Sequence, residues 1–204
     1  MTKFKQAQTG AKQIQIPLGR NKTGPTPKYT NVRPKNGIQG SIIHNINGII
    51  VGGGPLSSAT IIAVNAAAAK TPAQWRRYIA YEGKVKVGGS LAWRANNPGN
   101  LRDATTKIGS VSGAVGLFAV FANLDEGRTA QKNLYINRYG AMKVRDAIDK
   151  LTPPSENDTT HYLAELKKAG VDLDKNVSSQ IDVLMKAIET NEGLIAGIEV
   201  PRAL

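Results

Sequence analysis

Cysteine is absent from this chain of 204 residues, histidine occurs twice, and aromatic residues make up 5% of the sequence. The lack of cysteine excludes a disulfide framework and a thiolate metal site. With only two histidines and no phosphate-binding loop, the sequence predicts neither a metal nor a cofactor. Because aromatic side chains are few, the core must be built mostly from aliphatic residues.

Acidic residues are missing from the first part of the chain, where no Asp or Glu occurs before Glu82. Residues 1–81 contain eleven Lys or Arg and therefore carry a formal charge of +11, whereas residues 82–204 carry +1. This excess implies a polyanionic or acidic neighbour for the front of the molecule. Nucleic acid, a capsid wall, an acidic protein surface and an anionic cell-wall polymer all fit that description.

Long hydrophobic runs are also missing. Residues 1–35 are polar and basic without the apolar stretch of a secretory signal peptide. Residues 41–69 are richer in Ile, Val and Ala, but His44, Pro55 and several Asn and Gly residues interrupt them. The sequence therefore predicts no membrane span.

The first 70 residues divide into two parts. Residues 1–40 contain four prolines and few apolar residues, which predicts an extended basic arm. The alternatives for this arm are a disordered tail and a segment held by a partner. Residues 41–70 form a connector, with a short hairpin turning at Asn47-Gly48. A glycine-rich linker follows, and then an alanine-rich helix over residues 58–70.

The sequence pattern of residues 71–204 predicts a mainly α domain. One long polar loop or short β-hairpin is expected over residues 84–122. Thr71, Pro72 and Gln74 have the spacing of a helix N-terminus, and Gly83 supplies the stop signal. Four further helices are expected from cap residues and apolar stripes: about 123–139, 144–151, from 157 or 158 to 170, and from 178 or 179 onward.

Glu82 would end the first of these helices, on the face that carries Trp75 and Ile79. The negative end of the helix dipole and a desolvating neighbour both raise the pKa of a carboxyl group, as a proton donor near neutral pH requires. The alternative is an exposed glutamate that happens to end a helix. Asp103 is the best candidate for a second catalytic carboxylate.

The Asn-Asn-Pro-Gly-Asn motif at residues 96–100 follows Glu82 and concentrates amide side chains suited to acetamido and hydroxyl groups. The motif is equally typical of a plain turn. Trp93 is a candidate sugar-stacking platform or a buried core residue. The predicted substrate-binding residues are Trp93, Asn97, Asn100, Phe121 and Tyr162.

These segments together resemble the lysozyme-like superfamily, in particular peptidoglycan-cleaving lytic transglycosylases. Residues 81–83 resemble the end of that group's first core helix with its catalytic Glu, and residues 112–117 resemble its Gly-Leu segment. The resemblance implies that residues 71–204 form a lysozyme-like domain. It also implies that Glu82 protonates the bond between two amino sugars of peptidoglycan and then acts as a base.

A narrower resemblance covers residues 93–171. Residues 94–102, 118–121 and 153–159 are similar, in that order, to a phage family of virion structural proteins and cell-wall lysins. This resemblance implies a virion protein that acts at phage entry in the host periplasm or cell wall. Its partners would be peptidoglycan and, through residues 1–70, neighbouring virion proteins.

Two readings of the function remain open. In the first, the protein is a peptidoglycan glycosidase of the lytic transglycosylase type, which needs one acid/base, or of the muramidase type, which uses two carboxylates. In the second, it is an inactive structural virion protein anchored by its arm, whose positive charge also touches packaged nucleic acid non-specifically. A nucleic-acid enzyme or sequence-specific binder has little support, because no base-reading motif occurs.

Overall fold

The computed structural model describes residues 41–43, 46–113, 116–152 and 158–202, so the predicted arm at residues 1–40 lies outside the described residues. The strands are β1 (Ser41–Ile43), β2 (Ile46–Ile50), β3 (Arg77–Ala80), β4 (Lys84–Val87), β5 (Gly109–Gly113), β6 (Gly116–Val120) and β7 (Ile198–Pro201). The α-helices are α1 (Ser58–Ala69), α2 (Leu91–Arg94), α3 (Leu124–Tyr139), α4 (Val144–Leu151), α5 (Thr159–Lys168) and α6 (Ile181–Asn191). The mainly α, lysozyme-like prediction is wrong, because two sheets accompany the helices and the fold is α+β.

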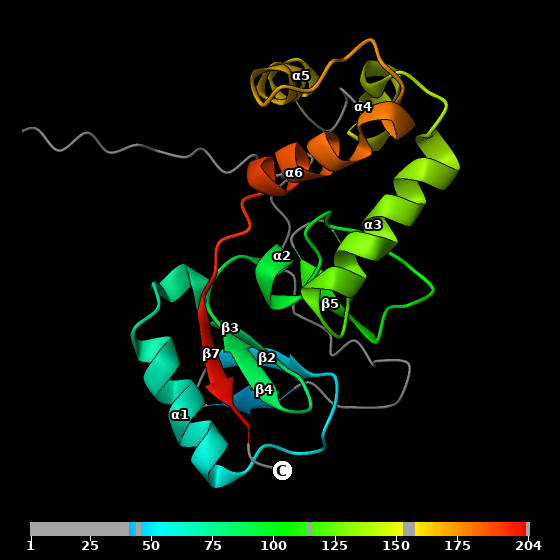
Figure 1. Cartoon of the computed structure of the whole chain (residues 1–204). Coiled ribbons are helices and arrows are strands. Elements are labelled where there is room, and N and C mark those ends of the chain that lie inside the picture. The colour runs from blue at the N-terminus through cyan, green and yellow to red at the C-terminus, as the bar shows by residue number, and fades with distance from the viewer. Residues whose placement is uncertain (1–40, 44–45, 114–115, 153–157, 203–204) are drawn as a thin grey trace, which may run out of the picture.

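The larger sheet has the strand order β1-β2-β3-β4-β7 in the described part of the chain. The predicted hairpin is confirmed, since β1 and β2 pair antiparallel, but Asn47 lies within the ladder opposite Ile42 rather than in the turn. The alanine-rich helix is confirmed as α1, and it connects β2 to its parallel neighbour β3 (Figure 1). The sheet therefore runs across the boundary predicted between residues 70 and 71.

The helix predicted over residues 71–82 is wrong. The Thr71 hydroxyl donates to the carbonyl of Ala67, so it closes the end of α1 instead of starting a new helix. A short 3₁₀ turn, Ala73–Trp75, follows, and the next residues form β3 between β2 and β4. The hydrogen bonds of β3 to its two neighbouring strands outweigh the local capping signal. Tertiary contacts commonly override local propensity in this way.

Side chains of β3 alternate between two layers, as the period of a strand requires. Tyr78 and Ala80 pack towards α1 in one apolar cluster, with Val64 as a central residue. Ile79 and Tyr81 pack on the opposite face with Val120 of the β5–β6 hairpin. The sheet is therefore covered by α1 on one side and by α2 with the hairpin on the other.

The later helices form a separate layer above the sheet (Figure 1). Two of the predicted caps are confirmed: Asn123 accepts from the Glu126 amide, and Asp158 accepts from the His161 amide. The start predicted at Ser178 or Ser179 is wrong, because these residues lie in a 3₁₀ turn and α6 begins at Ile181. The apolar stripe of α4 is buried with residues of α3, α5 and α6. Within the described ranges, no helix combines the length and apolar character needed to cross a membrane.

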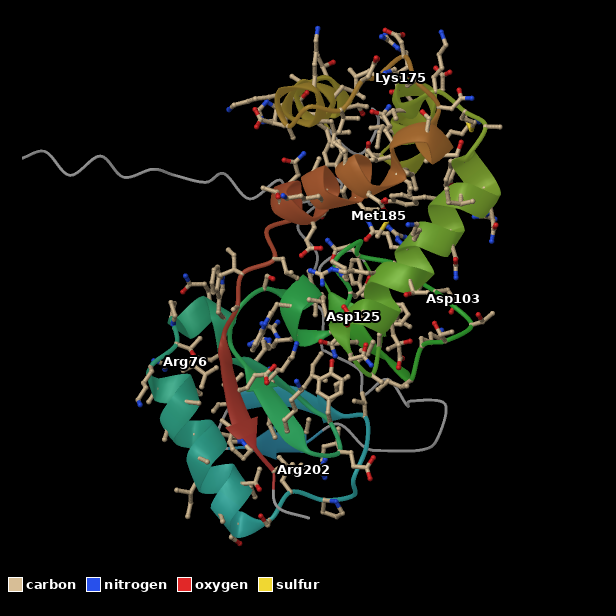
Figure 2. The ribbon with its side chains drawn as sticks, in the orientation of Figure 1. Arg76, Asp103, Asp125, Lys175, Met185 and Arg202 are labelled. Atoms are coloured by element: carbon tan, nitrogen blue, oxygen red, sulfur yellow. The ribbon has the colours of Figure 1, made fainter. Side chains whose placement is uncertain are left out.

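The chain returns to the sheet after α6 through β7, which pairs antiparallel with β4. Arg202 follows β7 and lies beside the sheet (Figure 2). Its guanidinium donates to the carbonyls of Tyr81 and Gly53, at 2.6 Å each, and to those of the neighbouring residues 52, 54 and 55. This single side chain fastens the glycine-rich loop to the β3–β4 turn.

Candidate functional site

Glu82 lies in the turn between β3 and β4 and is exposed. Its predicted position at a helix C-terminus is therefore wrong, and no helix dipole acts on it. Its backbone lies against Gly52 and Gly53, beside the loop that Arg202 holds. Glu82 is a solvated turn carboxylate and lacks the shielding that a proton donor needs.

Asn97 is 1% exposed, and its side chain is used within the fold. Its Nδ2 donates to the carbonyls of Leu101 and Ala119, at 2.9 Å each, and its Oδ1 accepts from the Leu101 amide at 2.8 Å. Asn96 is equally buried, and its Nδ2 donates to the Phe121 carbonyl at 2.9 Å. These amides hold the loop in one conformation, and Asn97 offers no free group to a substrate.

The two aromatic candidates of this region occupy different environments. Phe121 is fully buried beside Leu101 and Ala119, so it is a core residue rather than a groove wall. Trp93 is partly exposed, and the Lys86 ammonium lies 4.4 Å from the centre of its ring. Burial lowers the pKa of Lys86 to about 8, and its Nζ donates to Asn96 Oδ1 at 2.6 Å.

The structure brings Asn100 and Tyr162 together on a carboxylate that the sequence analysis missed, Glu192. Asn100 Nδ2 donates to Glu192 Oε2 at 2.6 Å, and the Tyr162 hydroxyl donates to Oε1 at 3.3 Å. Tyr162 itself is 3% exposed. Residues from the polar loop, α5 and the end of α6 therefore meet at one acidic group.

Glu192 is the C-cap residue of α6. Burial raises the pKa of its carboxyl group, and the hydrogen bonds from Asn100 and Tyr162 oppose that rise only in part. Burial and the nearby Glu192 charge also raise the pKa of Tyr162, which keeps the phenol protonated. A partly buried carboxyl group at the negative end of a helix dipole, facing the Asn-rich loop, is close to the arrangement that had been expected for Glu82.

The loop conformation explains how Asn100 reaches Glu192. Asn96 and Asn100 both have positive φ, 52° and 49°, a region that asparagine tolerates better than most residues. The buried hydrogen bonds of Asn96 and Asn97 fix this backbone path. Gly99 packs closely against Gln131 of α3, because a Cβ added at Gly99 would lie 2.5 Å from the Gln131 Cδ. The side chain of Asn100 is therefore presented by a rigid loop.

Asp103 lies on the loop beside α3 and is exposed (Figure 2). Its carboxylate forms an ion pair with Lys107 at 2.5 Å. It lines the rim of a groove between this loop and α3. Asp103 is thus exposed and paired with a cation, whereas Glu192 is partly buried and bound by neutral donors.

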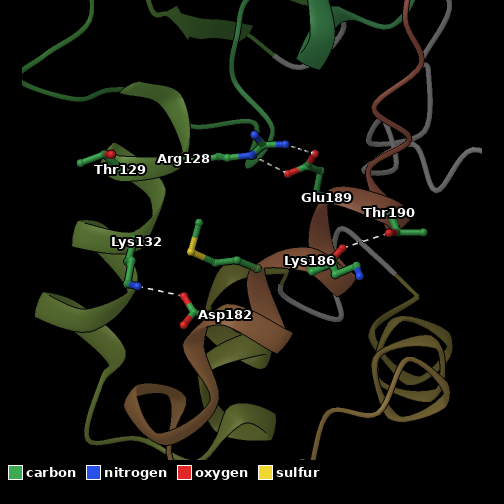
Figure 3. A pocket seen from close by; sticks show the side chains of 8 residues that line it. Arg128, Thr129, Lys132, Asp182, Lys186, Glu189 and Thr190 are labelled. Atoms are coloured by element: carbon green, nitrogen blue, oxygen red, sulfur yellow. Dashed lines mark hydrogen bonds and ion pairs between the residues drawn. The ribbon is translucent and has the colours of Figure 1, made fainter. Parts of the chain in front are cut away.

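A second hollow of about 550 Å³ lies between α3 and α6 (Figure 3). Arg128 donates to both carboxylate oxygens of Glu189, and Lys132 pairs with Asp182 at 2.8 Å. These ion pairs join the two helices and satisfy four of the charged groups around the hollow. It therefore presents few free groups for chemistry.

A signal for Glu192 was present in the sequence. Glu192 precedes Gly193 at the end of an apolar helical stripe, which is the same pattern that drew attention to Glu82 and Gly83. Only the tertiary structure distinguishes the two, because the segment before Glu192 is a helix and the segment before Glu82 is a strand. Neither a protein-family model nor a curated protein matches this chain.

Proposed function

We propose that the protein is a glycosidase that cleaves peptidoglycan, with Glu192 rather than Glu82 as its proton donor. The observation that carries this proposal is the partly buried Glu192 carboxyl group, held between Asn100 and Tyr162 at the end of α6. A raised pKa keeps a larger fraction of such a group protonated near neutral pH. A protonated carboxyl group can donate to the oxygen of a glycosidic bond.

The hydrogen bonds to Glu192 favour one oxygen as the site of the proton when the group is protonated. Asn100 Nδ2 is a donor and needs an acceptor, so Oε2 remains unprotonated. In the protonated state of Glu192 the proton is therefore carried by Oε1, whose 3.3 Å contact with Tyr162 is the looser of the two. After the proton is transferred to the leaving group, the carboxylate is stabilised by both donors and can act as a base.

A mechanism of the lytic transglycosylase type suits this site best, because it requires one acid/base group. Asp103, the candidate for a second catalytic carboxylate, is neutralised by Lys107. The resemblance of residues 94–102 and 118–121 to a phage family supports the bacterial cell wall as the substrate and the virion as the location. Residues 1–70 would then attach the protein to neighbouring virion components.

The test is clearing of purified peptidoglycan in a zymogram by the wild-type chain, Glu192→Gln and Glu82→Gln. We expect Glu192→Gln to lose at least a hundredfold of the activity, a typical contribution of a general acid. Glu82→Gln is the matched control and should clear like the wild type. If Glu82→Gln is the inactive variant, or if Glu192→Gln clears normally, Glu192 is not the proton donor.

A structural virion protein is the second candidate function. It is favoured by the engagement of Asn97 and Phe121 within the fold and by the exposure of Glu82. The acid-free first 81 residues suit attachment to an acidic or polyanionic virion component. Absence of clearing by the wild-type chain in the same zymogram would favour this candidate.

A further inference from the structure

A groove of about 480 Å³ lies between the loop that follows Leu101 and one side of α3. Its apolar lining comes from Leu101, Ala104, Ala130 and Leu134. The groove begins directly after Asn100, the residue that contacts Glu192. None of the proposed catalytic chemistry uses it.

The polar walls of the groove carry neutral groups that are not used within the described part of the protein. Thr105 and Thr106 contribute hydroxyl groups from the loop, and Thr129, Asn133 and Asn137 contribute a hydroxyl and two amides from α3. All five residues are exposed. Each side chain offers both a donor and an acceptor.

The three polar residues of α3 follow one another at intervals of four residues. Four residues rise about 6 Å along a helix, so Thr129, Asn133 and Asn137 form a row along one side of α3. A row of this kind, above an apolar floor, matches a polymer that presents hydroxyl groups at regular intervals and C–H faces between them.

The charges at the rim favour an uncharged ligand. Asp103, Asp125 and Glu126 all line the groove, and Arg138 is the lining cation. Asp103 pairs with Lys107, Asp125 with Arg128, and Glu126 with the Asn123 side chain. Because these carboxylates are matched by nearby cations, the rim has little net charge to attract either a polyanion or a polycation.

We infer that this groove between residues 101–106 and α3 is a binding site for a neutral, hydroxyl-rich glycan chain. The Asn amides and Thr hydroxyls bind hydroxyl and acetamido groups of successive sugars, and the apolar floor packs against the faces of the rings. The site is separate from Glu192, so glycan binding here does not depend on the catalytic role of that residue.

The experiment measures binding of a soluble oligomer of β-1,4-linked N-acetylglucosamine to the full chain by titration calorimetry. We expect the double variant Asn133→Ala/Asn137→Ala to bind at least tenfold more weakly than the wild type. Thr105→Ala/Thr106→Ala tests the opposite wall and should also weaken binding. Asn176→Ala, an exposed amide away from the groove, is the matched control and should bind normally.

Circular dichroism of each variant checks that a loss of binding is not a loss of folding. No binding by the wild type, or unchanged binding by both double variants, would overturn the inference. Glu192→Gln separates this site from the proposed activity, since it should bind the oligomer like the wild type and fail to clear peptidoglycan. Normal clearing by Glu192→Gln would refute the catalytic proposal. It would not affect the inference that the groove binds a glycan.

Discussion

At the scale of single residues, burial of Glu192 links the stability of the fold to pH. Because burial raises its pKa in the folded state, the unfolded chain releases this proton first as the pH rises above about 4.3. Its contribution to stability is therefore complete below that pH and is lost as the pH rises through the folded pKa. We expect Glu192→Gln, which cannot ionise, to gain stability relative to the wild type between pH 4 and pH 8.

The gain would be about 1.4 kcal/mol for each unit by which the pKa is raised. Urea denaturation of both chains at pH 4 and pH 8 measures it. Glu82→Gln removes a carboxylate from an exposed turn and serves as the reference for the loss of one negative charge. A stability difference between wild type and Glu192→Gln that is the same at both pH values would contradict a raised pKa.

The residues of the Asn-rich loop illustrate how far sequence reasoning reaches. The composition of residues 96–100 predicts a turn rich in amides, and the structure has one. The sequence does not reveal which amides face inwards, because burial depends on segments that arrive later in the chain. Asn97 bonds to Ala119 and is structural, whereas Asn100 reaches Glu192 and belongs to the candidate site.

At the scale of elements, helices with a capping side chain or a clear apolar stripe could be predicted from the sequence. Asn123 caps α3 and the stripe of α4 is buried, because these signals act within one or two turns. The strand β3 could not be predicted in the same way. Its hydrogen-bonding partners are β2, which precedes α1, and β4, and neither is encoded in the local pattern of residues 71–82.

The start of α3 tests how tightly the helix is packed on the Asn-rich loop. Replacing a helical glycine by alanine normally stabilises a protein by up to about 1 kcal/mol. At Gly127 the added Cβ would lie 1.8 Å from the carbonyl oxygen of Asn96, so the backbone of one element must move. We therefore expect Gly127→Ala to destabilise the protein by about 1–3 kcal/mol, in the range of overpacked cores.

Thermal and urea unfolding of Gly127→Ala measure this change. Gly83→Ala is the matched control, because nothing lies within 4 Å of the added methyl group and its stability should stay close to that of the wild type. If Gly127→Ala stabilises the protein as an ordinary helical substitution does, α3 is not in close contact with the loop. If Gly127→Ala loses both stability and peptidoglycan clearing, the contact between Gly127 and the Asn-rich loop also positions Asn100.

At the scale of the whole molecule, the fold is closed by strands that are distant in sequence. β7 pairs with β4 after the chain has passed through α3 to α6, and Arg202 then bonds to the loop beside β2. Local periodicity gives no information on such pairings, so the sequence pattern favoured a mainly α domain with a polar loop or short β-hairpin. The mixed sheet is what separates this fold from the lysozyme-like prediction.

The uneven charge of the chain leads to a prediction about residues 1–40, which contain eight Lys or Arg and no acid. Deleting them lowers the formal charge from +12 to +4. Binding to a polyanion depends on the number of cations that displace counterions, so its salt dependence should weaken. We expect the truncated chain to elute from a heparin column at a lower salt concentration than the wild type. It should also be incorporated poorly into particles. Its clearing of peptidoglycan should be retained.

A full-length chain with the eight Lys and Arg of residues 1–40 replaced by Gln separates charge from length. If charge alone attaches the protein, this variant behaves like the truncated chain in both assays. If it binds heparin weakly but is incorporated normally, the partner recognises the uncharged side chains or the backbone of the segment. Elution of the truncated chain at the wild-type salt concentration would show that residues 1–40 do not contact the polyanion, and the attachment surface would then lie within residues 41–204.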